Sequence, residues 1–263
     1  MHSVTTDDGA AADEPRRATR PLSTAVKLLA LLDVLADVDE PVRVSSLARV
    51  IGASRAEVHR QLVTLEAAGW MEQLPDDSYR LTLRPAHLGH TALRQAGIGE
   101  RTAPMLADTA RACGDVVSIA VLDAATARVV QRAEPGRGLY ATLLLGDRLD
   151  LASSATGRLL CALADARTAA ELEQAGVALP GPEERALIRA TGWATSTDDD
   201  ADGIAAVAVP LCREDGPPVA ALSLHGPRER ITATGALAVL RPLAHRIEPL
   251  LRLDSGAPFG LHG

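Results

Sequence analysis

The chain has 263 residues, of which 47% are hydrophobic and only 2% aromatic, and its formal net charge at pH 7 is -7. This length accommodates two domains of ordinary size with cores of Leu, Val, Ile and Ala. The negative charge excludes DNA binding by bulk charge alone, but it allows a local basic face.

Residues 1–20 are small, polar and charged, without hydrophobic periodicity, and we expect a disordered arm there. They contain no apolar run, so the sequence predicts no signal peptide. Arg16, Arg17 and Arg20 close the arm. The arm is either a solvated tail or a segment that contacts DNA phosphates beside the first helix.

A helix follows, and Ser23 or Thr24 can cap its start. The segment "DVDEPVRV" ends it. The periodic apolar side chains of this helix predict a well-buried element: Val26, Leu28, Leu29, Leu31, Leu32 and Leu35.

The stretch "SLARVIGASRAEVHRQLVTLEAAGW" predicts two helices joined by a turn at Gly52. The second helix begins at Ser54, where "SRAE" has the pattern of a capping box between Ser54 and Glu57. The apolar face of this helix has three members: Val58, Leu62 and Leu65. Packed in this way, the second helix can enter the major groove of DNA.

The open side of the second helix carries the predicted DNA contacts, which are Ser54, Arg55, His59, Arg60 and Thr64. Arg55 and Arg60 can bond guanine edges or phosphates, and Ser54 with the helix N-terminus suits a phosphate. Glu57 could accept from a cytosine amine, although capping explains it more simply. The alternative is a plain helical hairpin with a solvated charged face.

Two short strands around "PDDS" predict a hairpin and complete a winged helix-turn-helix that ends near Arg84. Tyr79, Leu81 and Leu83 alternate with polar residues, as in a half-buried strand. The acidic tip would repel phosphates, so Arg80 is the predicted DNA contact of the wing.

The rest of the chain predicts a linking helix at 85–99, an α+β domain at 100–252 around a mostly antiparallel sheet, and a flexible tail at 253–263. The expected strands are "DVVSIAVLD", "ARVVQRAE", "GIAAVAVPLC" and "PVAALSLHG". The expected helices are residues 100–112, "TGRLLCALA", "TAAELEQAG", "GPEERALIRATG" and residues 232–251.

Several motifs of both domains resemble the IclR family of bacterial transcriptional regulators. The resemblance runs over "VKLLALLDVLA", "VSSLARVIGASRAEVHRQLVTLEAAGW" and "YRLTL", and then over "LASSATGRLLCALA", "GWATSTDDDADGIAAVAVPL" and "PVAALSLHGPRERI". It implies an α+β fold, in which a winged helix-turn-helix domain (21–84) is joined by a helix to a GAF-like sensing domain. It also implies dimers or tetramers on palindromic double-stranded DNA, a carboxylate effector and no cofactor.

The same resemblance implies the residues of the effector site: Ala155, Thr156, Gly157, Ser196, Ala206, Ser223 and His225. Family members often carry a cysteine in place of Ala206 and a serine in place of His225. Backbone N–H groups at the helix start near Thr156, together with His225, could hold a carboxylate. A protonated imidazole would make effector affinity fall between about pH 6 and 8. Alternatively, Ser223 and His225 are ordinary residues of one strand face.

An enzyme, a metal sensor and a ligand-binding module without DNA binding are the rival functions. We predict no catalytic residue, because same-face strand neighbours such as Ser223 and His225 transfer protons poorly and G-x-S-x-G, G-x-G-x-x-G and Walker sequences are absent. His87 and His90 have helical spacing, yet exposed polar residues explain them better than a metal site. Arg55 and Arg60 argue against a module that does not bind DNA.

Three scattered cysteines, Cys113, Cys161 and Cys212, form no C-x-x-C pair and favour a reducing cytoplasm. No segment reaches about 18 uninterrupted apolar residues, so we expect no membrane partner.

Overall fold

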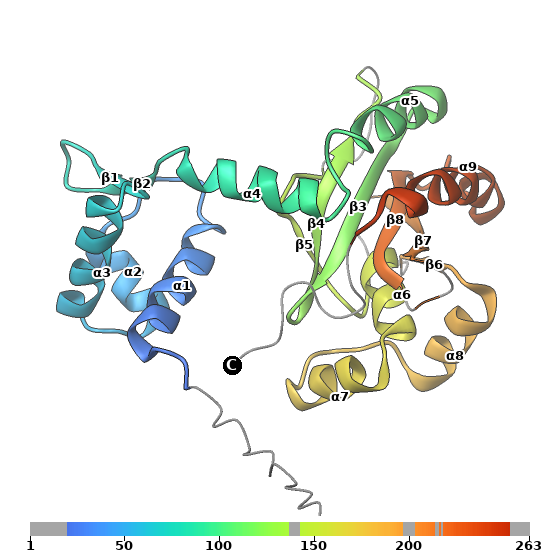
Figure 1. Ribbon diagram of the computed structural model, residues 1–263. Helices are drawn as coiled ribbons and strands as arrows, with labels where there is room; N and C mark the ends of the chain where they lie inside the picture. The colour runs from blue at the N-terminus through green and yellow to red at the C-terminus, as the bar shows by residue number, and fades with distance from the viewer. Residues whose placement is uncertain (1–19, 137–142, 197–202, 214–215, 217, 253–263) are drawn as a thin grey trace, which may run out of the picture. The chain divides into compact units, whose positions relative to one another are not determined.

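A computed structural model describes residues 20–136, 143–196, 203–213, 216 and 218–252 (Figure 1). The chain divides into two compact units, residues 1–84 and 85–263, and each is considered by itself. The predicted arm up to residue 19, residues 197–202 and the predicted tail from residue 253 lie outside the described residues.

The first unit is a winged helix-turn-helix, as the sequence predicted. Its elements are α1 (Ser23–Leu35), α2 (Val44–Ile51), α3 (Arg55–Ala67), β1 (Met71–Gln73) and β2 (Tyr79–Leu81). The two strands pair antiparallel, and Val42 bridges to Tyr79. A single apolar core, which includes Leu31, Leu47 and Leu62, holds the helices and the hairpin together.

Helix α1 is less buried than its sequence predicted. Leu22 occupies the N-cap position without a side-chain cap, whereas Ser23 and Thr24 lie inside the helix, so the expected cap is wrong. Only Leu31 and Leu35 are buried along α1. A helix on the surface of a small domain buries one stripe, and Leu28, Leu32 and Val34 are partly buried beside it. Three other apolar side chains form an outer stripe: Leu22, Val26 and Leu29, which are 78%, 50% and 60% exposed.

The start of α3 confirms one half of the predicted capping box. The Ser54 hydroxyl accepts a hydrogen bond from the Glu57 backbone N–H at 3.2 Å. The Glu57 carboxylate does not reach back; it accepts from Lys27 Nζ of α1 at 2.7 Å, so the other half is wrong. The hydrogen bond from Lys27 holds the pKa of Glu57 below its usual value. The only lysine of the chain therefore neutralises an acid at the start of α3.

The wing hairpin is shorter than its alternation predicted. The strand ends at Leu81, and Leu83 lies 88% exposed beyond the pairing. At the tip, Asp76 accepts from the backbone N–H and hydroxyl of Ser78, at 3.2 and 2.6 Å. These bonds close the turn through an acidic side chain, which is a common use of Asp in turns.

The second unit alternates helices and strands. Its elements are α4 (Arg84–Gln95, which starts at the last residue of the first unit), α5 (Ala103–Cys113), β3 (Val116–Asp123), β4 (Thr126–Ala133), β5 (Arg148–Leu149), α6 (Ala155–Leu163), α7 (Ala166–Gln174), α8 (Pro182–Thr191), β6 (Ala194–Thr195), β7 (Ile204–Cys212), β8 (Pro218–Pro227), α9 (Ala233–Ile247) and the 3-10 turn η1 (Glu248–Leu250). No helix among the described residues is long and apolar enough to cross a membrane.

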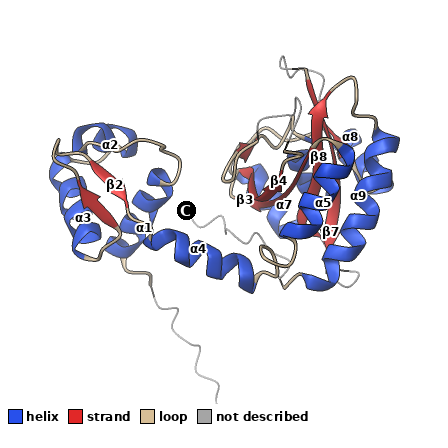
Figure 2. Ribbon diagram, turned by 90° about the horizontal axis from the view of Figure 1, so that it is seen from above, coloured by secondary structure: helices blue, strands red, loops and turns tan. Residues whose placement is uncertain are grey.

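The strands form one sheet in the order β5-β4-β3-β8-β7-β6, and all neighbouring strands are antiparallel. Figure 2 shows β3, β4, β7 and β8 of this sheet. This confirms the α+β class with an antiparallel sheet. The edge strands β5 and β6 were missed, because two residues show no alternation that a sequence pattern can reveal.

The two faces of this sheet have different cores. On one face, α5 and α9 pack over strand side chains such as Ile119 and Leu222, and Leu240 of α9 belongs to the same core. On the other face, which we call the α6 face, small residues such as Ala208 and Ala221 let α6 approach the strands. A separate apolar cluster also lies on the α6 face: Val116, Ala120, Val129 and Leu143.

Candidate DNA-binding face and effector site

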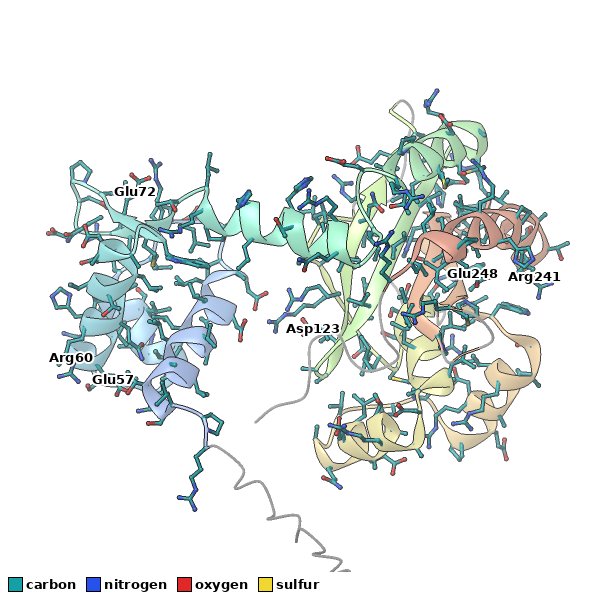
Figure 3. All side chains as sticks on the ribbon, viewed as in Figure 1. Glu57, Arg60, Glu72, Asp123, Arg241 and Glu248 are labelled. Atoms are coloured by element: carbon teal, nitrogen blue, oxygen red, sulfur yellow. The ribbon has the colours of Figure 1, made fainter. Side chains whose placement is uncertain are left out.

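The outer side of α3 is exposed and bears the residues that were expected to contact DNA: Ser54, Arg55, His59, Arg60 and Thr64. Burial of Val58, Leu62 and Leu65 on the inner side fixes this orientation. Arg60 lies at the outer edge of the helix in Figure 3. Thr64 donates its hydroxyl proton to the Arg60 carbonyl at 2.8 Å, so toward DNA it can only accept. Val63 is also exposed on this helix and was missed.

A surface hollow beside this face adds residues that sequence reasoning missed. It is lined by Ser45, Ser46, Ala48, Arg49, Ala53 and Arg55. Arg49 lies in the last turn of α2, and Arg55 is the first residue of α3. Two guanidinium groups beside the start of α3 suit a phosphate. The available signal was the basic last turn of α2 immediately before Gly52.

The wing residue Arg80 is engaged within the protein. Its Nε donates to Glu72 Oε1 of the neighbouring strand at 2.6 Å, and both side chains are about half exposed. Exposed pairs of this kind contribute about 0–1 kcal/mol. Exchange of Glu72 for a DNA phosphate would therefore cost little.

On the α6 face, Ser223 and His225 of β8 meet Ser118 of β3. Ser118 lies directly opposite Ser223 in the strand pairing. The Ser223 hydroxyl is 2.8 Å from the Ser118 hydroxyl and 2.8 Å from His225 Nε2, and the Ser118 hydroxyl is 3.1 Å from His225 Nε2. All three side chains are buried. Ser118 was missed, although a serine within the apolar run of β3 was a visible signal.

This cluster corrects two expectations about His225. Burial lowers the pKa of the imidazole to about 4, so His225 is neutral between pH 6 and 8 in the free protein, and the expected partial positive charge is wrong. The short Ser223–His225 bond shows that these strand neighbours do meet at a distance typical of a nucleophile and its base.

His225 should make the stability of the second unit depend on pH. In the unfolded chain the imidazole binds a proton near pH 6.5, whereas the folded protein binds it only near pH 4. The unfolded state therefore takes up the proton first, and the free energy of unfolding falls as pH drops from 6.5 toward 4. We expect His225→Asn to remove roughly 2 kcal/mol of the stability loss between pH 7 and 5. Urea unfolding of both proteins at both pH values measures this, and identical pH dependence would contradict it.

The first turn of α6 contains Ala155, Thr156 and Gly157, all of which are buried. The N-cap residue Ser154 accepts from the Gly157 N–H at 3.0 Å. The Thr156 hydroxyl is buried without a hydrogen-bond partner among the described residues. Buried polar atoms are rarely left unsatisfied, so this hydroxyl is a candidate for contact with a ligand.

Ser196 and Ala206 lie together beside this face. The Ser196 hydroxyl accepts from the Ala206 N–H at 3.0 Å, and the Ser196 N–H donates to the Ala206 carbonyl at 3.0 Å. Ala206 is opposite His225 in the sheet. The structure thus brings Ala206 to the Ser118–Ser223–His225 cluster, while the Ser196 hydroxyl is occupied by the backbone.

The residues weighed as metal ligands stay apart. His87 and His90 are exposed on α4, and His90 lies 3.5 Å from Glu100. No group of three or more His, Cys, Asp or Glu side chains gathers as a metal site within the ranges that the structure describes. Burial raises the pKa of each cysteine thiol, that of Cys161 to about 12, which favours the unreactive thiol form.

Two family models match the chain. The model "Bacterial transcriptional regulator IclR C-terminal" matches residues 90–248, and the model "IclR helix-turn-helix domain" matches residues 24–75. The HTH-type transcriptional regulator XynR of Escherichia coli K12 is 25% identical over 215 residues, which cover 77% of this chain and 85% of that protein.

Solved structures share the fold. An IclR transcriptional regulator from Alicyclobacillus acidocaldarius has a TM-score of 0.76 at 20% identity, covering 88% of this chain and 99% of its own. An IclR homolog from Microbacterium hydrocarbonoxydans, complexed with 4-hydroxybenzoate, has a TM-score of 0.69 at 23% identity, with 88% and 99% coverage. At these identities the likeness concerns the fold alone.

Proposed function

Because this chain belongs to the IclR family of DNA-binding transcriptional regulators, we propose that a small organic acid, bound on the α6 face, sets its affinity for a palindromic operator. Residues 21–84 bind DNA, 85–99 link the domains, and 100–252 bind the effector. The observation that carries the proposal is that one chain has both an exposed basic helix face in its first unit and a buried polar cluster in its second unit.

The DNA half of the proposal rests on the outer face of α3. Arg55 and Arg60 are exposed there, while Glu57 is paired with Lys27. The face therefore offers positive charge although the chain as a whole is acidic. Local charge and helix geometry, rather than net charge, steer a protein to a groove.

The effector half rests on buried groups that a ligand can satisfy. Ser118, Ser223 and His225 form a hydrogen-bonding cluster inside the domain, and the Thr156 hydroxyl lacks a partner among the described residues. Burial of polar groups is costly unless they are hydrogen-bonded. The 4-hydroxybenzoate bound to the Microbacterium homolog supports a carboxylic acid as the ligand class. We assign the cluster to binding rather than catalysis.

DNase footprinting on the DNA upstream of its own coding sequence tests the DNA half. We expect protection of a palindrome, with half-sites about one helical turn, or a multiple of it, apart. Uniform weak binding to all DNA would contradict a sequence-specific operator.

Assembly should depend on α4 and on the outer stripe of α1. Helix α4 has no buried residue among those described, and its Leu88 is 59% exposed. Leu93 of α4 packs against the core of the second unit. A 12-residue helix with so little packing is marginal in water, so we propose that α4 packs against a second copy. Leu88→Asp combined with Leu29→Asp should lower the mass found by sedimentation and weaken operator binding. Leu187→Asp is the control, because Leu187 is an exposed leucine on α8. An unchanged mass in the double variant would refute this assembly.

A further inference from the structure

A cationic partner would strengthen binding of an acid on the α6 face, and His225 does not supply one. The imidazole is neutral at pH 7 because burial lowers its pKa to about 4. Its Nε2 is also shared by the Ser118 and Ser223 hydroxyls. The cluster can thus recognise a hydroxyl or carbonyl group, but it does not neutralise a carboxylate.

Arg132 of β4 supplies a cation from the strands of this face. It lies opposite Ser118 in the pairing of β3 with β4, and directly opposed residues project from the same face of a sheet. Ser118 in turn opposes Ser223. Among the described residues of β3, β4, β7 and β8 that project to the α6 face, Arg132 is the only lysine or arginine.

A bulge puts Arg132 there. The register of β3 and β4 shifts between Ile119 and Ala120, so that Val129 pairs with Ala120 and Gln131 with Ile119. Val130 packs into the core under α5 and α9, and Gln131 also turns that way, donating to the Gly99 carbonyl at 2.9 Å. If the strand alternated strictly from Val129, Arg132 would project to the side of α5 and α9. Val130 is the extra residue of the bulge, and it returns Arg132 to the α6 face.

The surroundings of Arg132 suit an exchange of anions. Its guanidinium donates to the Glu134 carboxylate, and the two side chains are 23% and 33% exposed. Ser223 lies two strands away, a span of about 10 Å. An acid lying over Ser118 could therefore touch Arg132 at one end and Ser223 with His225 at the other. The apolar cluster of Val116, Ala120, Val129 and Leu143 shares this face.

We propose that Arg132 binds the carboxylate of the effector, which takes the place of Glu134 on the guanidinium. Glu134 acts as an internal competitor that holds the arginine in position when the effector is absent. The effector is then a monocarboxylate with an apolar body and a hydroxyl or oxo group at its far end. This inference rests on the proposed organic-acid effector.

Calorimetry on the full chain tests it. The probes are 4-hydroxybenzoate and aliphatic monocarboxylates of three to six carbons with a terminal hydroxyl, each beside its neutral amide. Arg132→Gln should weaken binding of the acids at least tenfold and leave the amides unchanged. Glu134→Gln should tighten binding of the acids severalfold. Arg128→Gln is the matched control, because Arg128 lies on the same strand, faces the other side and pairs with Asp123.

Three outcomes would count against the inference. Equal acid affinities in wild type and Arg132→Gln would overturn it alone and leave the effector class intact. Wild-type protein that binds none of the acids would overturn the organic-acid effector, and this inference with it. If Arg132→Gln does not fold, Arg132→Met keeps the apolar stem of the side chain without its charge, and undiminished acid binding by that variant would overturn the inference.

Discussion

Replacing Arg60 with alanine should weaken specific operator binding by about 1–3 kcal/mol if its guanidinium reads a base. The reason is its position on the outer face of α3, opposite the buried Val58, Leu62 and Leu65 (Figure 3). The loss corresponds to roughly a 5- to 150-fold rise in Kd. Fluorescence anisotropy with the operator and with unrelated DNA measures it.

The two DNA substrates separate the roles open to Arg60. A base contact is lost only on the operator, whereas a phosphate contact is lost on all DNA and reduces the salt slope by about 1. Arg241→Ala, which removes an exposed arginine from α9, controls for net charge (Figure 3). Unchanged affinity of Arg60→Ala for every sequence would remove α3 from the interface.

The second large effect is expected at Gly157, in the first turn of α6. A Cβ at this position would lie 2.3 Å from the Asp150 carbonyl oxygen and 2.7 Å from Leu151 Cα. Both are backbone atoms, so Gly157→Ala forces α6 away from the preceding loop. We expect a loss of about 1–3 kcal/mol or more in the free energy of unfolding, together with loss of effector binding.

Gly89→Ala is the matched control for this substitution. Gly89 is also helical and in the second unit, but a Cβ there meets nothing within 4 Å. A helical glycine replaced in open space gains about 0.5–1 kcal/mol. Thermal unfolding of the three proteins decides the matter: equal stability of wild type and Gly157→Ala would mean that the loop yields easily and that the close approach is not needed.

The outer face of α3, the candidate DNA-binding face, was predictable because a helix fixes its own geometry. Once Val58, Leu62 and Leu65 are taken as the buried side, a period of 3.6 residues sends Arg60 outward. Local side-chain chemistry likewise gave the Ser54 cap. The Lys27–Glu57 pair was beyond such reasoning, because its partners are 30 residues apart and meet only through tertiary packing.

The candidate effector site was only partly predictable, for a related reason. Ser223 and His225 share a strand, so alternation alone puts them on one face. Ser118 joins them through strand pairing, and Arg132 reaches that face only through the bulge. The protonation of His225 depends on burial by distant elements. A pattern read along the chain contains none of these three facts.

Coupling between the two domains is the central claim, and one titration tests it most directly. The affinity of the full chain for its footprinted operator is measured by anisotropy without ligand and with a saturating acid that calorimetry has shown to bind. We predict that the acid changes the Kd for the operator by at least fivefold in the wild type, a coupling of about 1 kcal/mol, and does not change it in Arg132→Gln. An operator Kd that is the same with and without a bound acid would contradict effector control.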